Sequence, residues 1–398
     1  LKEVKIPEGI KWINPDCFRG CKNLTNIELP SSIKRIKPRA FKGCTSLASI
    51  NIPESVVEIG DQAFMNCRSL KKIVLQEGIQ SISPRTFKNC SALSDIIIPE
   101  SVSLIECEAF MNCISLKKIV LPKRMDGFGY SVFYNSGLKE INFEEITRND
   151  EGVEDNRTLE ISENMFAYTP LEKITIPDEF TYIGEGAFLG CSELVSVDMS
   201  PNVYFIGGHA FRGCTNLKSI DLPKPLMAIK RSTFEGCTAL TDINVPSNVS
   251  YISYYAFEGC SNIKTVNLNG AARLKRIESN SFRECSSLSS ISLPDTVRYL
   301  GYNSFDGCTN LKSVNLNDGL ENIDRDAFRN CSSLENIVLP DTLKSLGNGA
   351  FSYSGLKSIN MDIFNSMEAE KIPDGVFSNT QLTTLNVPEN IRDIGYKS

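Results

Sequence analysis

Cysteine is the residue type in this chain that could take part in the widest range of chemistry, because its thiolate binds zinc, attacks electrophiles and forms disulfides. The chain holds 14 cysteines among 398 residues. A zinc site needs ligands that converge from different directions, as paired C-x-x-C motifs provide, and the sequence contains no such pair. Twelve cysteines share one spacing, three residues after a phenylalanine: Cys21, Cys44, Cys67, Cys90, Cys113, Cys191, Cys214, Cys237, Cys260, Cys285, Cys308 and Cys331.

This single spacing predicts a column of buried thiols, one for each repeat of the chain and about 4.8 Å apart. Four copies read "FYNSGL", "FAYTPL", "FSYSGL" and "FSNTQL", and in them the cysteine and one loop residue are missing together. We interpret the thiol as a small apolar group that fills a pocket whose shape depends on that loop. Disulfide or metal use is the alternative. Cys17 and Cys107 lie outside the column, and Cys17 is the first candidate for such use.

Histidine, the usual general acid or base, occurs once, as His209 in "GGHAF". It stands at a variable position before Ala-Phe, where other copies carry Arg39, Gln62, Glu108, Tyr255 or Asp326, and we expect that position to face solvent. No serine or cysteine near it is held at a nucleophile's turn, and no phosphate-binding or dinucleotide-binding glycine motif is present. The sequence therefore predicts no catalytic residue, no cofactor, no metal site and no enzyme.

A 23-residue repeat supplies the elements that would hold these residues, and a repeat of this fidelity predicts one elongated body. Each copy reads roughly A-F-x-x-C-x-x-L-x-x-I-x-L-P-x-x-V-x-x-I-G. The I-x-L segment alternates like a short strand that a proline closes, V-x-x-I-G predicts a second strand, and A-F-x-x-C a turn or brief 3₁₀ helix with a buried phenylalanine. The sixteen phenylalanines are Phe18, Phe41, Phe64, Phe87, Phe110, Phe133, Phe166, Phe188, Phe211, Phe234, Phe257, Phe282, Phe305, Phe328, Phe351 and Phe377.

The repeated motif resembles the BspA-type leucine-rich repeat, and the resemblance covers essentially residues 1–398. It implies an α/β-type repeat protein: a curved, right-handed leucine-rich-repeat solenoid of short β-strands, turns and brief 3₁₀ helices, in one domain of about 16–17 rungs. Proteins of this family are found on the surface of, or secreted by, host-associated microbes. The resemblance thus implies an adhesion or recognition module that binds a protein or a glycan. The alternative is a structural spacer that projects another domain of a longer protein.

An acidic insertion at residues 144–165 concentrates the charge of the chain. It holds eight acids and two arginines, a net charge of −6, which equals the net charge of the whole chain. The rest is balanced, so the basic stripe of a nucleic-acid-binding protein is missing, and no apolar run is long enough for a membrane span. We interpret the insertion as a solvated loop and expect a monomer. Calcium binding is the alternative for the loop, through Asp150, Glu151, Glu154 and Asp155.

An apolar strip is the first candidate binding surface. The outward residue of the I-x-L strand is polar in most copies, but it is Val74, Ile97 and Val120 in three consecutive ones. Exposed apolar area usually marks a contact surface, although strand propensity or coverage by residues 123–130 would also explain it. The strip is flanked by four lysines, Lys71, Lys72, Lys117 and Lys118.

An aromatic stripe on or near the V-x-x-I-G strands is the second candidate surface. Aromatic rings with polar tips suit stacking on sugars or packing against a partner chain, whereas packing of the rings along the column is the alternative. The stripe comprises Tyr182, Phe205, Tyr251, Tyr254, Tyr299 and Tyr302.

Overall fold

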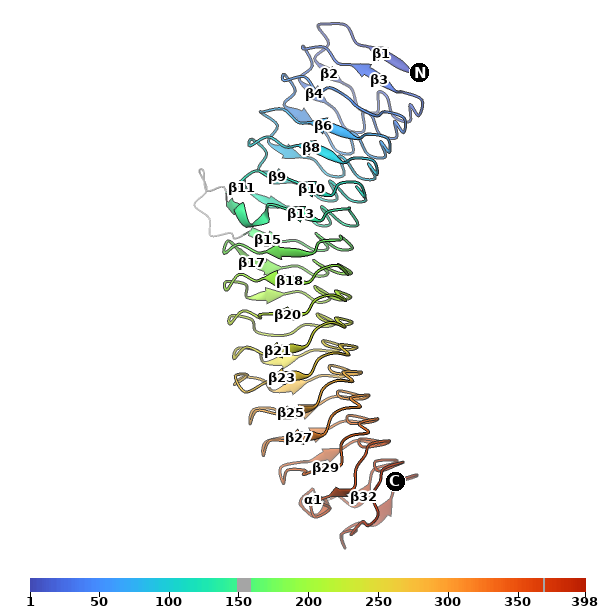
Figure 1. Ribbon diagram of the computed structural model, residues 1–398, viewed down its shortest axis with the longest axis vertical. Coiled ribbons are helices and arrows are strands. Elements are labelled where there is room, and N and C mark those ends of the chain that lie inside the picture. Colours follow the sequence, from blue (N-terminus) through green and yellow to red (C-terminus); the bar gives the residue numbers. More distant parts are fainter. Residues whose placement is uncertain (149–158, 368) are drawn as a thin grey trace. The chain divides into compact units, whose positions relative to one another are not determined.

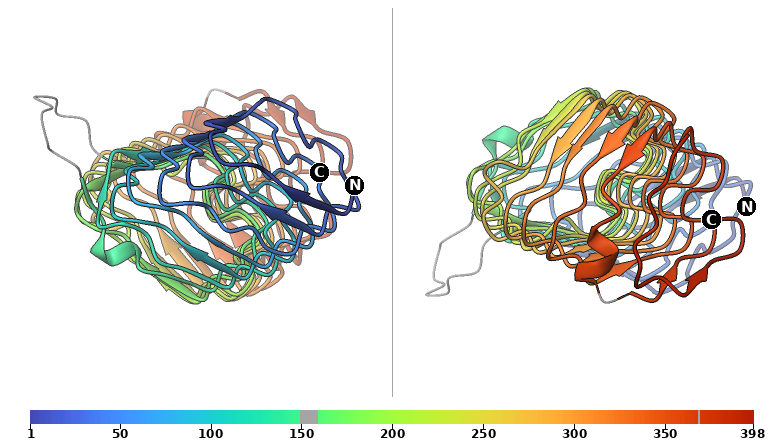
Figure 2. Two further views of the ribbon diagram at one scale, coloured as in Figure 1. Left: turned by 90° about the horizontal axis from the view of Figure 1, so that it is seen from above. Right: turned by 90° about the horizontal axis from the view of Figure 1, so that it is seen from below.

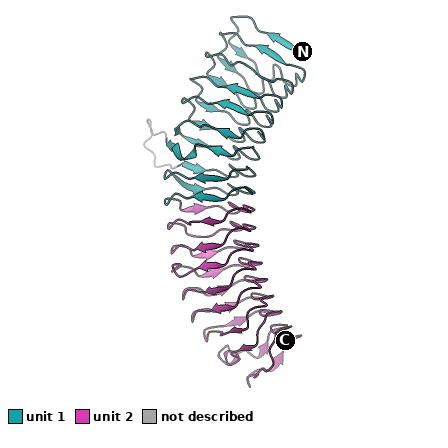
Figure 3. Ribbon diagram, in the orientation of Figure 1, with its two compact units in different colours: residues 1–202 teal, residues 203–398 magenta. Residues whose placement is uncertain are grey.

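The protein is a solenoid of stacked coils built from short parallel strands, as the repeat predicts (Figure 1). A computed structural model describes residues 1–148, 159–367 and 369–398. They form two compact units, residues 1–202 and 203–398 (Figure 3). That all copies form one domain, with residues 144–165 as an inserted loop, stays a prediction. No helix in the described residues is long and apolar enough to cross a membrane.

Unit 1 carries two series of parallel strands, which correspond to the two strand segments of the repeat. The I-x-L segments make the first-strand face, with β1 (Glu3–Lys5), β3 (Asn26–Glu28), β6 (Lys72–Val74), β8 (Asp95–Ile97), β10 (Lys118–Ile119), β13 (Glu140–Ile141), β16 (Lys173–Thr175) and β18 (Ser196–Asp198). The other series makes the second-strand face, with β2 (Trp12–Ile13), β4 (Arg35–Ile36), β5 (Glu58–Ile59), β7 (Ser81–Ile82), β9 (Leu104–Ile105), β11 (Arg124–Met125), β12 (Gly127–Phe128), β14 (Thr147–Arg148), β15 (Leu159–Ile161) and β17 (Phe180–Ile183). A 3₁₀ helix, η1 (Phe143–Glu145), follows β13.

Unit 2 repeats this arrangement. Its first-strand face holds β20 (Ser219–Ile220), β21 (Asp242–Asn244), β23 (Thr265–Asn267), β25 (Ser290–Ser292), β27 (Ser313–Asn315), β29 (Asn336–Ile337) and β31 (Ser358–Ile359). Its second-strand face holds β19 (Phe205–Ile206), β22 (Tyr251–Ile252), β24 (Arg276–Ile277), β26 (Tyr299–Leu300), β28 (Asn322–Ile323), β30 (Ser345–Leu346), β32 (Lys371–Ile372) and β33 (Asp393–Ile394). The short helix α1 (Ile363–Ser366) follows β31.

A third segment of each coil, the A-F-x-x-C turn, bonds alternately within the coil and to the next one. The N–H groups of Gln62, Phe64 and Asn66 donate to carbonyl oxygens of the following coil at 2.8–3.0 Å, while Ala63, Met65 and Cys67 donate three residues back. Gln62 and Asn66 adopt positive φ, 57° and 65°, which this alternation requires. The position before the cysteine is therefore mostly Gly or Asn, because these residues tolerate that conformation best. Seen along the stack, each coil makes one circuit around the interior (Figure 2).

The phenylalanines form stacked columns in the core, as the sequence predicts. In unit 1 the rings from Phe18 to Phe188 stack in sequence order, with centroids 5.4–5.8 Å apart and planes within 11° of parallel. In unit 2 the rings from Phe211 to Phe351 stack at 5.1–5.7 Å. Such offset pairs add to the stabilisation that each ring gains from burial.

The column cysteines act as hydrogen-bond donors, which refines their interpretation as apolar filler. The thiol of Cys67 donates to the carbonyl oxygen of Phe41 at 3.2 Å, and Cys113 donates in the same way to Phe87 at 3.1 Å. The copies without cysteine place a small hydroxyl residue there: Thr169 donates to the oxygen of Phe166 in its own coil at 2.7 Å, whereas the buried hydroxyls of Ser136 and Ser354 have no hydrogen-bond partner among the described residues. All 14 cysteines are free, Cys17 and Cys107 included. The position thus holds a small buried side chain, and where this is cysteine the thiol adds a hydrogen bond to the preceding coil.

Two of the short copies run close to the preceding coil. Gly137 donates its N–H to the oxygen of Cys113 at 3.1 Å, and a Cβ at this position would lie 2.2 Å from the oxygen of Ile114. Gly355 has the same approach to Ser332, at 2.3 Å. Only glycine fits there, which explains the shared "SGL" of these two copies.

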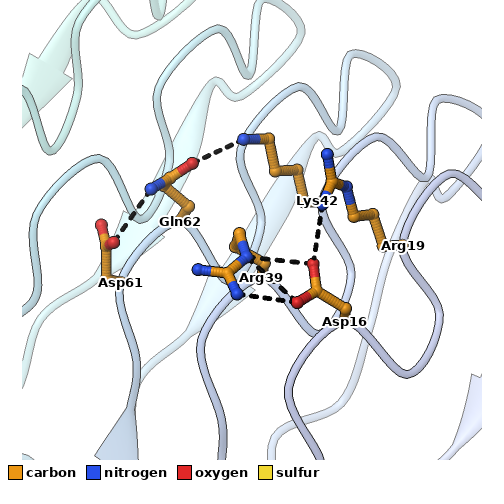
Figure 4. A network of polar contacts seen from close by, with 6 residues as sticks. All are labelled: Asp16, Arg19, Arg39, Lys42, Asp61 and Gln62. Carbon is orange, nitrogen blue, oxygen red and sulfur yellow. Dashed lines mark hydrogen bonds and ion pairs between the residues drawn. The ribbon is translucent and has the colours of Figure 1, made fainter.

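The expectation that the variable position before Ala-Phe faces solvent is wrong. Arg39, Gln62, Glu108 and His209 are half-buried, and Asp326 is buried. The side chains of Arg39, Gln62 and Glu108 form hydrogen bonds with the preceding coil. Figure 4 shows the contacts of this position in the first coils of unit 1, where the guanidinium of Arg39 donates to both carboxylate oxygens of Asp16, at 3.0 and 2.8 Å. The hydrogen bond from Arg39 lowers the pKa of Asp16.

Candidate functional site

The apolar strip of Val74, Ile97 and Val120 lies on the first-strand face of unit 1. Val74 pairs in register with Ile97, and Val120 follows directly after β10. Val74 is half-buried, whereas Ile97 and Val120 are 49% and 59% exposed, so residues 123–130 do not cover them. The inward residues of the same strands, Ile73, Ile96 and Ile119, are buried.

The four lysines beside the strip fall into two groups. Lys72 pairs with Asp95 at 2.8 Å, and Lys118 pairs with Glu140 at 3.0 Å. Lys71 and Lys117 have no ion-pair partner in the part of the chain that the structure describes, and both are exposed. Ion pairs this exposed contribute little to stability. The two pairs place positive and negative side chains alternately on consecutive coils beside the strip, in the order Lys72, Asp95, Lys118 and Glu140.

A hollow of about 680 Å³ opens on the same face, where the strip ends. Val120, Ile141 and Ile174 contribute apolar surface to it, and its charged lining comprises Lys118, Lys139, Glu140, Glu144, Glu172, Lys173 and Asp198. The Nζ of Lys139 lies 3.3 Å from a carboxylate oxygen of Glu172, which joins its two sides. This volume falls in the range of about 300–1,000 Å³ usual for ligand pockets.

The hollow coincides with an interruption of the strand ladder. Among the described residues β13 pairs with β10 and β16 with β18 but not with each other, and β8 and β10 on the same face are unpaired in the same way. Asn142 ends β13, because its side chain takes the place of a strand residue opposite Leu121. Its Oδ1 accepts from the Leu121 N–H at 2.8 Å, and its Nδ2 donates to the Leu121 oxygen at 3.0 Å. The main chain then turns away into η1.

The first-strand face of unit 2 differs in chemistry. Its outward residues are mostly small and uncharged, and the amide of Asn267 donates to Asn244 at 2.9 Å. A hollow of about 540 Å³ lies over β25, β27 and β29. One valine, Val338, is 73% exposed there and stands alone on its face.

The aromatic stripe is divided between the two units. Tyr182 lies on β17 of unit 1 and is half-buried. The other members belong to unit 2, where Tyr251 and Tyr299 flank Arg276 in register on the second-strand face. Tyr254 and Tyr302 lie beyond the strands and are 48% and 39% exposed.

Cations cover several rings of the stripe, which sequence reasoning missed. The Nζ of Lys230 lies 5.5 Å from the ring centre of Phe205 and 5.4 Å from that of Tyr251, and it donates to the Tyr251 hydroxyl at 2.8 Å. The guanidinium of Arg276 lies 4.1 Å from the ring centre of Tyr299. These are cation–π distances. Aromatic and basic residues alternating at the repeat period are the signal that would have indicated them.

Tyr299 is anchored at its polar end as well. Its hydroxyl donates to a carboxylate oxygen of Asp324 at 2.8 Å. Burial, together with this hydrogen bond, raises the pKa of Tyr299 to about 12. A ring held by a cation on its face and a carboxylate at its tip is rigid, and such anchored aromatics lose little conformational entropy when they bind.

Metal chemistry has no support in the described residues. They contain no group of three or more His, Cys, Asp or Glu side chains placed to hold an ion. The calcium candidates Asp150, Glu151, Glu154 and Asp155 lie outside the described residues. Burial raises the pKa of the Cys113 and Cys260 thiols to about 12, which keeps these two thiols protonated near neutral pH.

Comparison with known proteins supports the repeat assignment. The family model described as "BspA type Leucine rich repeat region (6 copies)" matches residues 1–106, 34–153, 159–285 and 275–398. A leucine-rich repeat protein from Bacteroides ovatus ATCC 8483 is 28% identical, with a TM-score of 0.64 over 79% of this chain and 86% of that one. A leucine-rich cell surface protein from Faecalibacterium prausnitzii A2-165 is 27% identical, with a TM-score of 0.49 over 79% of both chains. None of the curated proteins compared with the chain matches it.

Proposed function

The chain belongs to the BspA-type leucine-rich repeat family, and from that premise we propose that it is a non-enzymatic recognition or adhesion module of a cell-surface or secreted protein. Its partner is a protein or a glycan. The first-strand face of unit 1 is the surface on which a protein partner docks. Surface or secreted placement rests on the family.

The exposed apolar strip is the observation that carries this proposal. Ile97 and Val120 are about half exposed on a face whose other coils mostly carry polar residues, and exposed apolar surface of this kind favours protein contact. The alternating lysines and acids beside the strip provide a polar rim around it. An apolar centre with a polar rim is the usual composition of a protein interface.

The aromatic stripe of unit 2 is the second candidate surface, and the partly exposed Tyr254 and Tyr302 favour a glycan there. Lys230 and Arg276 cover the neighbouring rings, and the guanidinium of Arg325 lies 5.9 Å from the ring centre of Tyr302, so Tyr254 is the most exposed ring of the stripe. Replacing both tyrosines by serine should abolish any glycan binding measured on an array of polysaccharides. Unchanged glycan binding on the array would indicate that the rings of the stripe serve only to pack against one another along the column.

Replacing Val74, Ile97 and Val120 together by asparagine tests the strip. Most coils carry a polar residue at this position, and Ile73, Ile96 and Ile119 keep their buried places, so the fold should be unchanged. Adhesion to cultured epithelial cells and to immobilised matrix proteins should weaken about ten-fold or more, equivalent to about 1.4 kcal/mol. Val338→Asn, which removes an even more exposed valine from the corresponding face of unit 2, is the matched control and should bind like the wild type.

Two results would contradict the proposal. Unchanged adhesion of a folded triple variant would remove the strip as a binding surface and favour the spacer function, in which the repeats project another domain. Loss of folding, measured by circular dichroism, would show that the three residues belong to the core.

A further inference from the structure

Positive charge is concentrated on the second-strand face of unit 2, although the chain as a whole is acidic. The segments that carry this face in four neighbouring coils hold seven basic and two acidic residues, a net charge of +5, against −6 for the whole chain. They are residues 223–233, 246–255, 269–280 and 294–303. The overall balance of charge outside the acidic insertion hides this local excess.

Most of these cations lack an acidic partner. Arg276 pairs with Glu278 at 2.6 Å, and within the described residues no other basic side chain of the four segments forms an ion pair. An unpaired cation at the surface binds an anion without first breaking an internal ion pair. The unpaired cations that are also exposed are Lys224, Arg231, Arg273, Lys275 and Arg298.

The pairing of neighbouring coils places two of these cations side by side. The N–H of Arg298 donates to the oxygen of Lys275 at 2.9 Å, so the two residues hold the same position on successive coils, about one strand spacing of 4.8 Å apart. The next position along the strands holds Tyr251, Arg276 and Tyr299, which pair in register. A row of cations therefore runs along the stack beside a row of aromatic rings.

The arrangement of the rings favours a sugar over a nucleobase. Lys230 and Arg276 each cover a face of the tyrosine rings that they contact, at 5.4 Å from the centre of Tyr251 and 4.1 Å from that of Tyr299. A nucleobase binds by stacking on an open ring face, and these faces are occupied. Tyr254 is 48% exposed and offers its ring to the C–H groups of a sugar.

We propose that this surface binds an acidic polysaccharide, which carries carboxylate or sulfate groups along its chain. We define the basic patch as Lys230, Arg231, Lys275, Arg276 and Arg298. The proposal rests on the proposed recognition function and assigns a charge to the glycan of the aromatic stripe. The ammonium and guanidinium groups donate charge-assisted hydrogen bonds to the anionic groups, while Tyr254 contacts a sugar ring.

A polymer fits the basic patch better than a small anion does. One exposed ion pair contributes only about 0–1 kcal/mol, so a single carboxylate or sulfate would be held weakly. Cations on successive coils contact successive charged groups of one polysaccharide chain, and contacts that are linked in this way reinforce one another. The repeat of the protein thus matches the repeat of its ligand.

Binding of the whole protein to defined polysaccharides, measured by biolayer interferometry, is the first test. Dextran sulfate and dextran share a backbone and differ in charge, and hyaluronan carries carboxylate in place of sulfate. At least one charged polymer should bind about ten-fold more tightly than dextran and should lose about ten-fold in affinity between about 50 and about 200 mM salt, because salt screens its contacts. Failure of both charged polymers to bind, equal binding of dextran, or binding independent of salt would overturn the proposal.

Two double variants separate the basic patch from the effect of net charge. Lys275→Gln with Arg298→Gln should weaken binding of the charged polymer about ten-fold, equivalent to about 1.4 kcal/mol. Lys264→Gln with Lys312→Gln removes two exposed lysines beside β23 and β27, on the first-strand face of the same unit, and should bind like the wild type. All four side chains are exposed, so circular dichroism should show that both variants fold. Equal weakening in the two variants would show that only net charge attracts the polymer, which would overturn the site.

Single-stranded DNA tests the other class of polymer that cations and aromatic rings bind. A thymidine oligonucleotide should bind about ten-fold more weakly than the charged polysaccharide at the same concentration of anionic groups, because cations cover the ring faces on which its bases would stack. Equal or tighter binding of the oligonucleotide would assign the basic patch to nucleic acid and overturn the proposal.

The charge of the glycan and the recognition function fail independently. If dextran binds as tightly as the charged polymers and the tyrosine variant loses this binding, the stripe recognises a glycan and the basic patch is wrong. If no polysaccharide binds while the strip variant still loses adhesion, the recognition function holds through the apolar strip alone. If the charged polymers bind by these criteria while the strip variant adheres normally, the basic patch holds and the strip is wrong.

Discussion

Replacing Cys113 by serine should remove part of the protein's sensitivity to alkali. The thiol is fully buried, and burial raises its pKa from 9.0 to about 12. An acid whose pKa is raised on folding contributes stability that is complete below the unfolded pKa and is lost as the pH rises toward the folded pKa. Within that window each pH unit costs about 1.4 kcal/mol for this thiol.

Between about pH 8 and about pH 10, wild-type protein should therefore lose about 1.4 kcal/mol more of its free energy of unfolding than Cys113→Ser. With an m-value of roughly 3 kcal/mol per molar urea, the midpoint of unfolding should fall by about 0.5 M more. Urea titrations followed by circular dichroism at both pH values, with a reductant present, measure this difference. Cys113→Ala is the control, because it also lacks the thiol and must show the same weaker pH dependence.

Identical pH dependence in the wild type and both variants would refute the reasoning. It would mean that the thiol ionises as easily in the folded protein as in the unfolded chain, which is incompatible with a buried column. A difference in stability that is constant from neutral to alkaline pH would instead reflect only the loss of the hydrogen bond to Phe87.

Three further predictions concern packing, thiol access and acid stability. Phe257→Ala should cost about 3–5 kcal/mol of unfolding free energy in urea titrations, because its ring is buried between two stacked neighbours; a cost below about 1 kcal/mol would contradict the ring column. Under native conditions a maleimide should label only the three cysteines that are exposed or half-buried, and mass spectrometry should find labels on Cys17, Cys21 and Cys107 alone. Burial raises the pKa of Glu108, but hydrogen bonds from Arg85 and Lys88 outweigh burial and lower it, so its stabilisation is present above about pH 4.5 and is lost as the pH falls through the lower folded pKa. Thermal melts should therefore show a larger loss at about pH 3 for the wild type than for Glu108→Gln, and equal losses would contradict this ion pair.

The sequence predicts the repeated part of the fold well because each coil buries the same residue types at the same positions of the repeat. The spacing of Phe41, Phe64 and Phe87 directly indicates a stacked column, since identical residues at a fixed period meet in a solenoid. The small size of the group at Cys67 could be predicted from the sequence, whereas its hydrogen bond to the Phe41 oxygen of the preceding coil is visible only in the structure. Its interpretation as apolar filler considered only the size of the thiol.

The places where coils differ from one another were harder to predict. The period-two pattern of "LKEINF" indicates a strand as clearly as "LEKITI" does, so nothing in it reveals that β13 and β16 are unpaired. The Asn142 side chain, which takes the place of a backbone group opposite Leu121, is visible only in three dimensions. Arg276 and Tyr299 belong to neighbouring coils, so the pattern of aromatic residues alone did not reveal that Arg276 covers the Tyr299 ring.

The alternating hydrogen bonds of the A-F-x-x-C turn also bear on how such a chain lengthens in evolution. Gln62, Phe64 and Asn66 donate to the following coil through backbone groups alone, and the following coil offers the same acceptors whatever its side chains. Duplication or deletion of one 23-residue segment by unequal recombination would therefore rejoin matching donors and acceptors. The number of repeats can then change while the backbone hydrogen bonds between coils are kept, and the exposed residues can diverge to bind different ligands.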